Sequence, residues 1–126
     1  MRHRASLWAV LTASGCLLAS TAETQVIKDT VPGIRNLARV ESTVACAGAI
    51  TPDAVAAIKK MGYSAIINLR LADEPGADVD AHVVAAKAAG IQYIHIPFSS
   101  MNPDPAAVDT FLKAIMTPGV QPAFIH

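Results

Sequence analysis

The pattern of hydrophobic and polar residues predicts strands and helices in turn along most of the chain. Apolar and β-branched residues form two short strand-compatible stretches at 37–40 and 43–46. Compact apolar runs at 65–69, 91–97 and 122–126 indicate further strands, of which the first has the continuous apolar character of a buried parallel strand.

Three helices are expected between these strands. Thr51-Pro52 combines a capping hydroxyl with a proline at the first helical position, and Gly62 ends that helix. An alanine-rich helix covers 78–89, and Asp104-Pro105 repeats the cap-plus-proline start for a third helix. Because helices then alternate with strands, we expect an α/β fold with a mostly parallel sheet, flanked by helices through right-handed crossovers.

Residues 1–22 have the pattern of a secretory signal peptide. Arg2 and Arg4 form a basic start, an uncharged and mostly apolar run follows, and small residues precede a cleavage site after Ala22. The apolar run is shorter than the roughly 20 residues that a membrane-spanning helix needs. We therefore expect a protein exported to the periplasm or secreted, with no stable membrane insertion after cleavage.

Two alternatives to cleavage stay open: an uncleaved N-terminal anchor, and a lipoprotein modified at Cys16, because residues 13–16 resemble a lipobox. After the leader, residues 23–33 are polar without periodicity and are expected to form a flexible lead-in. One domain at 34–126 follows, a length too short for two.

Charge and cysteine content exclude several classes of protein. Without the leader the chain has 8 Lys and Arg (10 less Arg2 and Arg4) against 10 Asp and Glu, a net charge of −2. No basic block is present, so we expect no nucleic-acid partner. Cys46 is then the single cysteine, which excludes an intramolecular disulfide. No His or Cys spacing suits a metal, and we expect no metal or cofactor.

Four short sequences resemble a bacterial group of dual-specificity-phosphatase-like (protein-tyrosine-phosphatase-like) domains, some of them fused to an NAD-kinase-like part. They lie at 47–52, 66–70, 93–97 and 124–126. In that family a strand ending in His is followed at once by Cys, five further residues and Arg. The resemblance implies that the chain is the N-terminal part of such a domain, incomplete at its C-terminus, and that it stops at His126 just before this loop.

The resemblance also implies an activity. The parent protein is expected to be a cysteine-dependent phosphatase, a hydrolase acting on phosphoprotein or a small phosphorylated metabolite through a cysteinyl-phosphate intermediate. This chain by itself is expected to be inactive, because it contains no nucleophile of this type. Two other functions stay open: a sulfurtransferase of the rhodanese type, and a catalytically inactive exported binding module.

Three residues are candidates for the site. His126 matches the family position before the nucleophile and would support the phosphate-binding loop; the alternative is an ordinary strand-end histidine. Arg70 follows a central strand and would support the same loop or an anionic substrate, or else form a salt bridge to Asp73 or Glu74. Asp104 is a candidate general acid, but it also suits a helix N-cap.

Two further residues are interpreted as structural. Cys46 does not qualify as a nucleophile, because Pro52 stands six residues later where an Arg is needed, and we expect a half-buried strand cysteine. His95 lies within an apolar strand and is expected to be a hydrogen-bonded core histidine.

Overall fold

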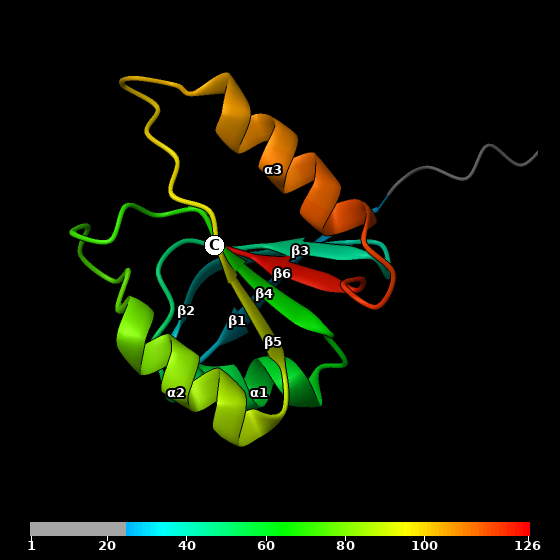
Figure 1. The fold of residues 1–126 in the computed structure, drawn as a ribbon. Coiled ribbons are helices and arrows are strands. Elements are labelled where there is room, and N and C mark those ends of the chain that lie inside the picture. The colour runs from blue at the N-terminus through cyan, green and yellow to red at the C-terminus, as the bar shows by residue number, and fades with distance from the viewer. Residues whose placement is uncertain (1–24) are drawn as a thin grey trace, which may run out of the picture.

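Six strands form one sheet in the order β1-β2-β3-β6-β4-β5 in the computed structural model, which describes residues 25–126 (Figure 1). Strands β3, β6, β4 and β5 run parallel, and β1 and β2 join that set as an antiparallel pair. The strand bounds are β1 Val26–Val31, β2 Ile34–Val40, β3 Val44–Cys46, β4 Ala65–Asn68, β5 Gln92–His95 and β6 Ala123–Ile125. The expected α/β fold, a mostly parallel sheet flanked by helices, is confirmed.

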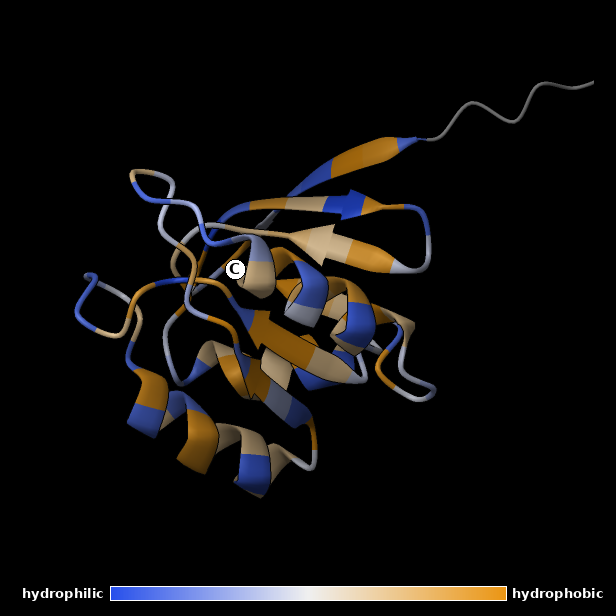
Figure 2. Ribbon diagram, turned by 45° about the horizontal axis from the view of Figure 1, so that its top comes forward, coloured by the Kyte–Doolittle hydropathy of each residue, from blue (hydrophilic) through white to orange (hydrophobic). Residues whose placement is uncertain are grey.

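Helices cover both faces of the sheet. α1 (Ala54–Lys60) and α2 (Val79–Ala89) lie on one face and α3 (Pro105–Met116) lies on the other, so the molecule has three layers (Figure 1). Two apolar clusters fill the spaces between the layers. Figure 2 shows hydrophobic residues concentrated in β4 and hydrophilic ones along the loops, as expected for a strand buried on both faces.

The larger cluster lies under α1 and α2, and the smaller one lies under α3. Phe124 of β6 and Ile66 of β4 are fully buried in the first, and the ring of Phe124 packs edge-to-face against Tyr63 with centroids 5.5 Å apart. Ile67 and Ala123 belong to the second cluster, against Phe111 of α3. The side chains of consecutive strand residues thus point to opposite faces of the sheet, and this alternation fixes the register of the central strands.

The structure corrects two expectations. Residues 26–31, expected within a flexible lead-in, form β1 and pair with β2, because the β-branched side chains of Val26, Ile27, Thr30 and Val31 favour extended backbone. Cys46, expected to be half-buried, is exposed at the end of the three-residue strand β3.

Smaller differences concern the ends of helices. α1 begins at Ala54 rather than at Pro52, and Asp53 occupies its N-cap position without a side-chain hydrogen bond. The leader at 1–22 and its Cys16 lie outside the described residues. Among residues 25–126, no helix is long and apolar enough to span a membrane.

Candidate functional site

Three polar side chains form a row at the carboxyl edge of the parallel strands. Asn68 and His95 are paired neighbours at the ends of β4 and β5. His126 follows β6, and its backbone N–H donates to the carbonyl of Ile67 at 3.0 Å, which continues the register to Asn68. In open α/β sheets ligands bind beyond this edge. The strand order therefore brings together residues that are 27 and 31 positions apart in the sequence (95 − 68 and 126 − 95).

Asn68 holds both ends of the loop that follows β4. Its side chain is fully buried; its Nδ2 donates to the carbonyl of Ala77 at 3.1 Å and to the Tyr93 hydroxyl at 2.8 Å. Its Oδ1 accepts a hydrogen bond from the backbone N–H of Arg70 at 2.9 Å. An amide has both a donor and an acceptor end, so this one side chain can fix both the start and the close of the loop.

His82 of α2 is also fully buried, and a carbonyl of the same loop determines the tautomer of its imidazole. Its Nδ1 lies 2.8 Å from the carbonyl oxygen of Ala77. A carbonyl oxygen only accepts, so Nδ1 carries the hydrogen and Nε2 presents a lone pair in the neutral ring. Among residues 25–126, Nε2 has no hydrogen-bond partner.

His126 faces His82. The two ring centroids are 5.3 Å apart and the rings are nearly perpendicular, with an interplanar angle of 79°. Burial, together with the smaller effects of the neighbouring His82, Arg70 and His95, lowers the pKa of His126 to about 4. The imidazole is therefore neutral near pH 7, and both of its nitrogens lack a partner within the described part of the chain.

These unpaired nitrogens distinguish the site from the rest of the core. A buried polar atom without a hydrogen bond costs about 1–3 kcal/mol, and most folded proteins contain few of them. His82 and His126 together contribute three such nitrogens. These three nitrogens are therefore the buried histidine atoms at this edge that residues 25–126 leave without a partner.

Arg70 stands on the loop, and the structure shows what it contacts. Its Nη2 donates to the Pro75 carbonyl at 3.0 Å and lies 3.5 Å from the Glu74 carboxylate, so the salt bridge that was the alternative to a site role is present. Its own carbonyl oxygen lies 2.9 Å from Nε2 of His95, which makes His95 the hydrogen-bonded histidine that the sequence predicts. Arg70 thus stabilises its loop, and a further contact with an anionic group stays a prediction.

Asp104 caps α3. Its Oδ1 accepts a hydrogen bond from the backbone N–H of Ala106 at 2.9 Å, and Pro105 occupies the first helical turn. The carboxylate is exposed on the loop that leads from β5 to the helix. The cap is therefore part of the structure, and a role as general acid stays a prediction.

Three residues at this edge, His82, Asn68 and Tyr93, were not among the site residues predicted from the sequence. A signal was present for His82, which stands four residues before Ala86 and so on the same face of the predicted helix, and both residues are buried. Asn68 is the one polar residue in the run 65–69. Within the described residues no group of three or more His, Cys, Asp or Glu side chains is arranged to hold a metal ion.

Residues 36–124 match the family described as the phosphatase-like domain of beta-lactamase hydrolase-like proteins. A DUF442 protein of Shewanella putrefaciens CN-32, described as a candidate phosphatase, has a similar structure, with a TM-score of 0.67, 23% identity and coverage of 75% of this chain. This chain spans 59% of that protein's length. No curated protein matches the chain.

Two other solved structures share the fold. A candidate phosphatase from Neisseria meningitidis z2491 aligns with a TM-score of 0.58 and 19% identity, over 68% of this chain and 61% of that one. The core catalytic domain of the PP-IP phosphatase SIW14 of S. cerevisiae, solved with citrate, aligns with a TM-score of 0.52 and 17% identity, over 66% and 49% of the two chains. At these identities the likeness concerns the fold alone, which is that of cysteine phosphatases.

Proposed function

The chain belongs to the family of phosphatase-like domains of beta-lactamase hydrolase-like proteins, and from this premise we propose that it forms part of a phosphatase that hydrolyses phosphate monoesters through a cysteinyl-phosphate intermediate. One observation carries the proposal: His126, at the end of the central strand β6, is buried, and neither of its ring nitrogens has a hydrogen-bond partner among residues 25–126. Backbone groups of a phosphate-binding loop directly after His126 would satisfy them.

The proposed chemistry has two steps. A cysteine thiolate in that loop attacks phosphorus, a sulfur–phosphorus bond forms, and the bond from phosphorus to the leaving oxygen breaks while a general acid protonates that oxygen. Water then attacks the phosphocysteine, which releases inorganic phosphate and returns the thiolate. Backbone N–H groups hold the phosphoryl oxygens and lower the thiol pKa, and an Arg binds two of these oxygens. Neither step uses a metal or a cofactor.

Residues of this chain would act around that loop. His126 would hold its first turn through an imidazole that is neutral near pH 7. Arg70, two residues after the end of the adjacent strand β4, would orient the loop or the anionic substrate. Asp104 would protonate the leaving oxygen from the loop between β5 and α3. Fusion to an NAD-kinase-like part stays a prediction, because the family match covers the phosphatase-like domain alone.

The test is to determine the codons that follow His126 in the gene and to assay the full product with p-nitrophenyl phosphate. We expect Cys followed six positions later by Arg, turnover of the aryl phosphate, and loss of that turnover when the cysteine is replaced by serine. A cysteine loop without the Arg, together with thiosulfate-dependent sulfur transfer, would replace the proposal with a rhodanese-type enzyme. Absence of the cysteine would leave a binding module.

A further inference from the structure

A hollow of about 600 Å³ opens beside the candidate site. Its walls are residues 33–35, residues 49–51, and Pro75, Gly76 and Asp78 of the loop after β4. The volume lies within the range of about 300–1,000 Å³ that is typical of small-molecule sites. The hollow is therefore large enough for an organic molecule rather than for an inorganic ion alone.

Two chain segments separate this hollow from His82 and His126. Gly76 and Asp78 line it, and the residue between them, Ala77, directs its carbonyl to His82 and Asn68 on the other side. The other segment begins at Ala47, whose N–H donates at 2.8 Å to the carbonyl of Ile125, the residue before His126. The loop at 75–78 thus contacts both the hollow and His82, and the segment at 47–51 connects the hollow to the end of β6.

Those walls are held by the backbone. Arg35 N–H donates to the Ala49 carbonyl at 3.0 Å, Gly48 N–H to the Arg35 carbonyl at 2.7 Å, and Thr51 N–H to the Gly33 carbonyl at 2.8 Å. Gly76 lies so close to Ala49 that a Cβ at position 76 would be 2.6 Å from the Ala49 methyl carbon. A pocket with such walls is formed before a ligand arrives, which reduces the entropic cost of binding.

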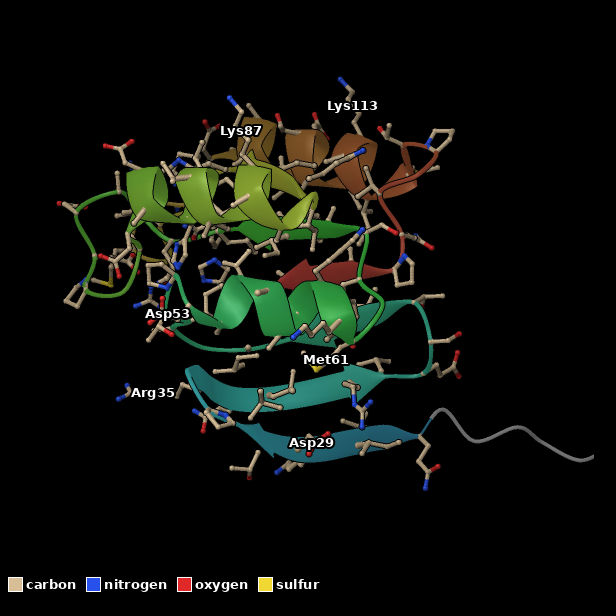
Figure 3. The ribbon with its side chains drawn as sticks, turned by 90° about the horizontal axis from the view of Figure 1, so that it is seen from below. Asp29, Arg35, Asp53, Met61, Lys87 and Lys113 are labelled. Carbon is tan, nitrogen blue, oxygen red and sulfur yellow. The ribbon has the colours of Figure 1, made fainter. Side chains whose placement is uncertain are left out.

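Arg35 gives the hollow a charge preference. Of the three arginines within residues 25–126, Arg39 pairs with Asp29 at 2.9 Å and Arg70 lies 3.5 Å from Glu74, whereas Arg35 has no salt bridge to another described residue. Figure 3 shows Arg35 at the end of the molecule where Asp53 and the loop after β4 also lie. An exposed guanidinium at the wall of a pocket suits bidentate binding of a carboxylate or phosphate.

We propose that this hollow binds the non-reacting end of the substrate and that Arg35 holds a second anionic group there, so that the substrate is a small phosphate monoester with an additional carboxylate or phosphate. This inference rests on the proposed phosphatase function. Asp78, which also lines the hollow, carries a negative charge and disfavours an anion beside it. Within the hollow the second anion is therefore expected at Arg35. Arg35 is thus a specificity-determining residue, and a folded phosphoprotein is the less suitable substrate.

The test measures binding without turnover. The 126-residue chain, ¹⁵N-labelled, is titrated with 3-phosphoglycerate and with glycerol 3-phosphate, which differ by a carboxylate in place of a hydroxymethyl group. Fructose 1,6-bisphosphate and fructose 6-phosphate form the corresponding pair for a second phosphate. We expect saturable shifts at the Arg35 Nε–H and at the Thr51 and Gly76 amides, and at least fivefold tighter binding of the member that carries the second anionic group, in one or both pairs.

Arg35→Gln should remove this preference, with about tenfold weaker binding of the favoured probe, a factor within the range of one charge-assisted contact. Arg39→Gln removes the same charge from the same strand outside the hollow and should bind like the parent chain. If Arg35→Gln does not fold, Arg35→Lys, which retains charge but loses the planar fork, should show an intermediate loss.

Equal binding within both pairs, or an unchanged preference in the Arg35 variant, would overturn the inference, and so would preferential occupation of the hollow by a phosphotyrosine peptide. Arg35-dependent binding combined with a complete gene product that hydrolyses none of the probes would contradict the proposed phosphatase function and leave the binding site established.

Discussion

At the scale of single residues, the carboxyl edge of the sheet contains buried polar side chains of two kinds. In one kind every hydrogen-bonding group has a partner, and in the other kind some nitrogens have none. Asn68 uses both ends of its amide and leaves nothing unpaired. His82 and His126, which are also buried, leave three ring nitrogens without partners among residues 25–126. Asn68 therefore holds the structure of the site, whereas His82 and His126 have nitrogens that can still form hydrogen bonds.

His126 makes stability depend on pH. Its folded-state pKa of about 4 lies below the ordinary value of 6.5, so between these values the unfolded chain binds a proton that the folded chain does not. This contribution is complete above about pH 6.5 and is lost as the pH falls toward 4, a decrease of about 3 kcal/mol in the free energy of unfolding. Urea unfolding at a series of pH values measures it. A His126→Asn chain should lack this part of the slope, and an identical pH profile in both proteins would contradict the assignment.

Asp104 allows its two roles to be separated. Asp104→Ala should lower the free energy of unfolding by about 1 kcal/mol, because the cap on Ala106 is lost, whereas Asp104→Asn retains a capping side chain and stability. If Asp104 is also the general acid, Asp104→Asn in the full gene product should slow hydrolysis of alkyl phosphates far more than that of p-nitrophenyl phosphate. Equal effects on both substrates would assign Asp104 to the cap alone.

At the scale of elements, the loop after β4 is the part that assembles the edge. Asn68 and Arg70 hold its ends, the Ala77 carbonyl joins it to α2 through His82, and Gly76 brings it against Ala49. Figure 1 shows this loop and the one that precedes α3 extending beyond the ends of the parallel strands. The loop thus acts as one packed unit between the hollow and the histidine pair.

Gly76→Ala tests that packing. The residue has φ of +80°, which L side chains rarely adopt, and the new methyl would meet Ala49 at 2.6 Å. Gly90→Ala is the matched control, since φ there is +66° and nothing lies within 4 Å of the added Cβ. Both changes carry the backbone cost of about 1–2 kcal/mol, and Gly76→Ala should lose roughly 1–3 kcal/mol more through overpacking. The midpoints of urea unfolding compare the two, and equal losses would show that the loop can move away from Ala49.

At the scale of the whole molecule, an antiparallel pair, β1 and β2, extends a parallel four-stranded set whose edge carries the site. We propose that this molecule acts outside the cytoplasm after removal of residues 1–22. Intact-mass measurement of protein from the periplasm should show a chain that begins at Glu23. A mass that retains Met1 would contradict cleavage, and a diacylglycerol adduct on Cys16 would identify a lipoprotein.

The sequence by itself determined the class of fold, since the apolar runs, the Asp104-Pro105 cap and the closing Gly90 are local signals that the structure retains. It also placed Arg70 and His126 at strand ends. Only the tertiary structure decided that β6 inserts between β3 and β4 with the register that sets His126 beside Asn68, and that α2 turns His82 toward them. Periodicity specifies which face of an element is buried, but strand order specifies which buried residues meet. Residues 26–31 likewise contain β-branched side chains that favour extended backbone, but only their pairing with β2 makes them a strand of the sheet.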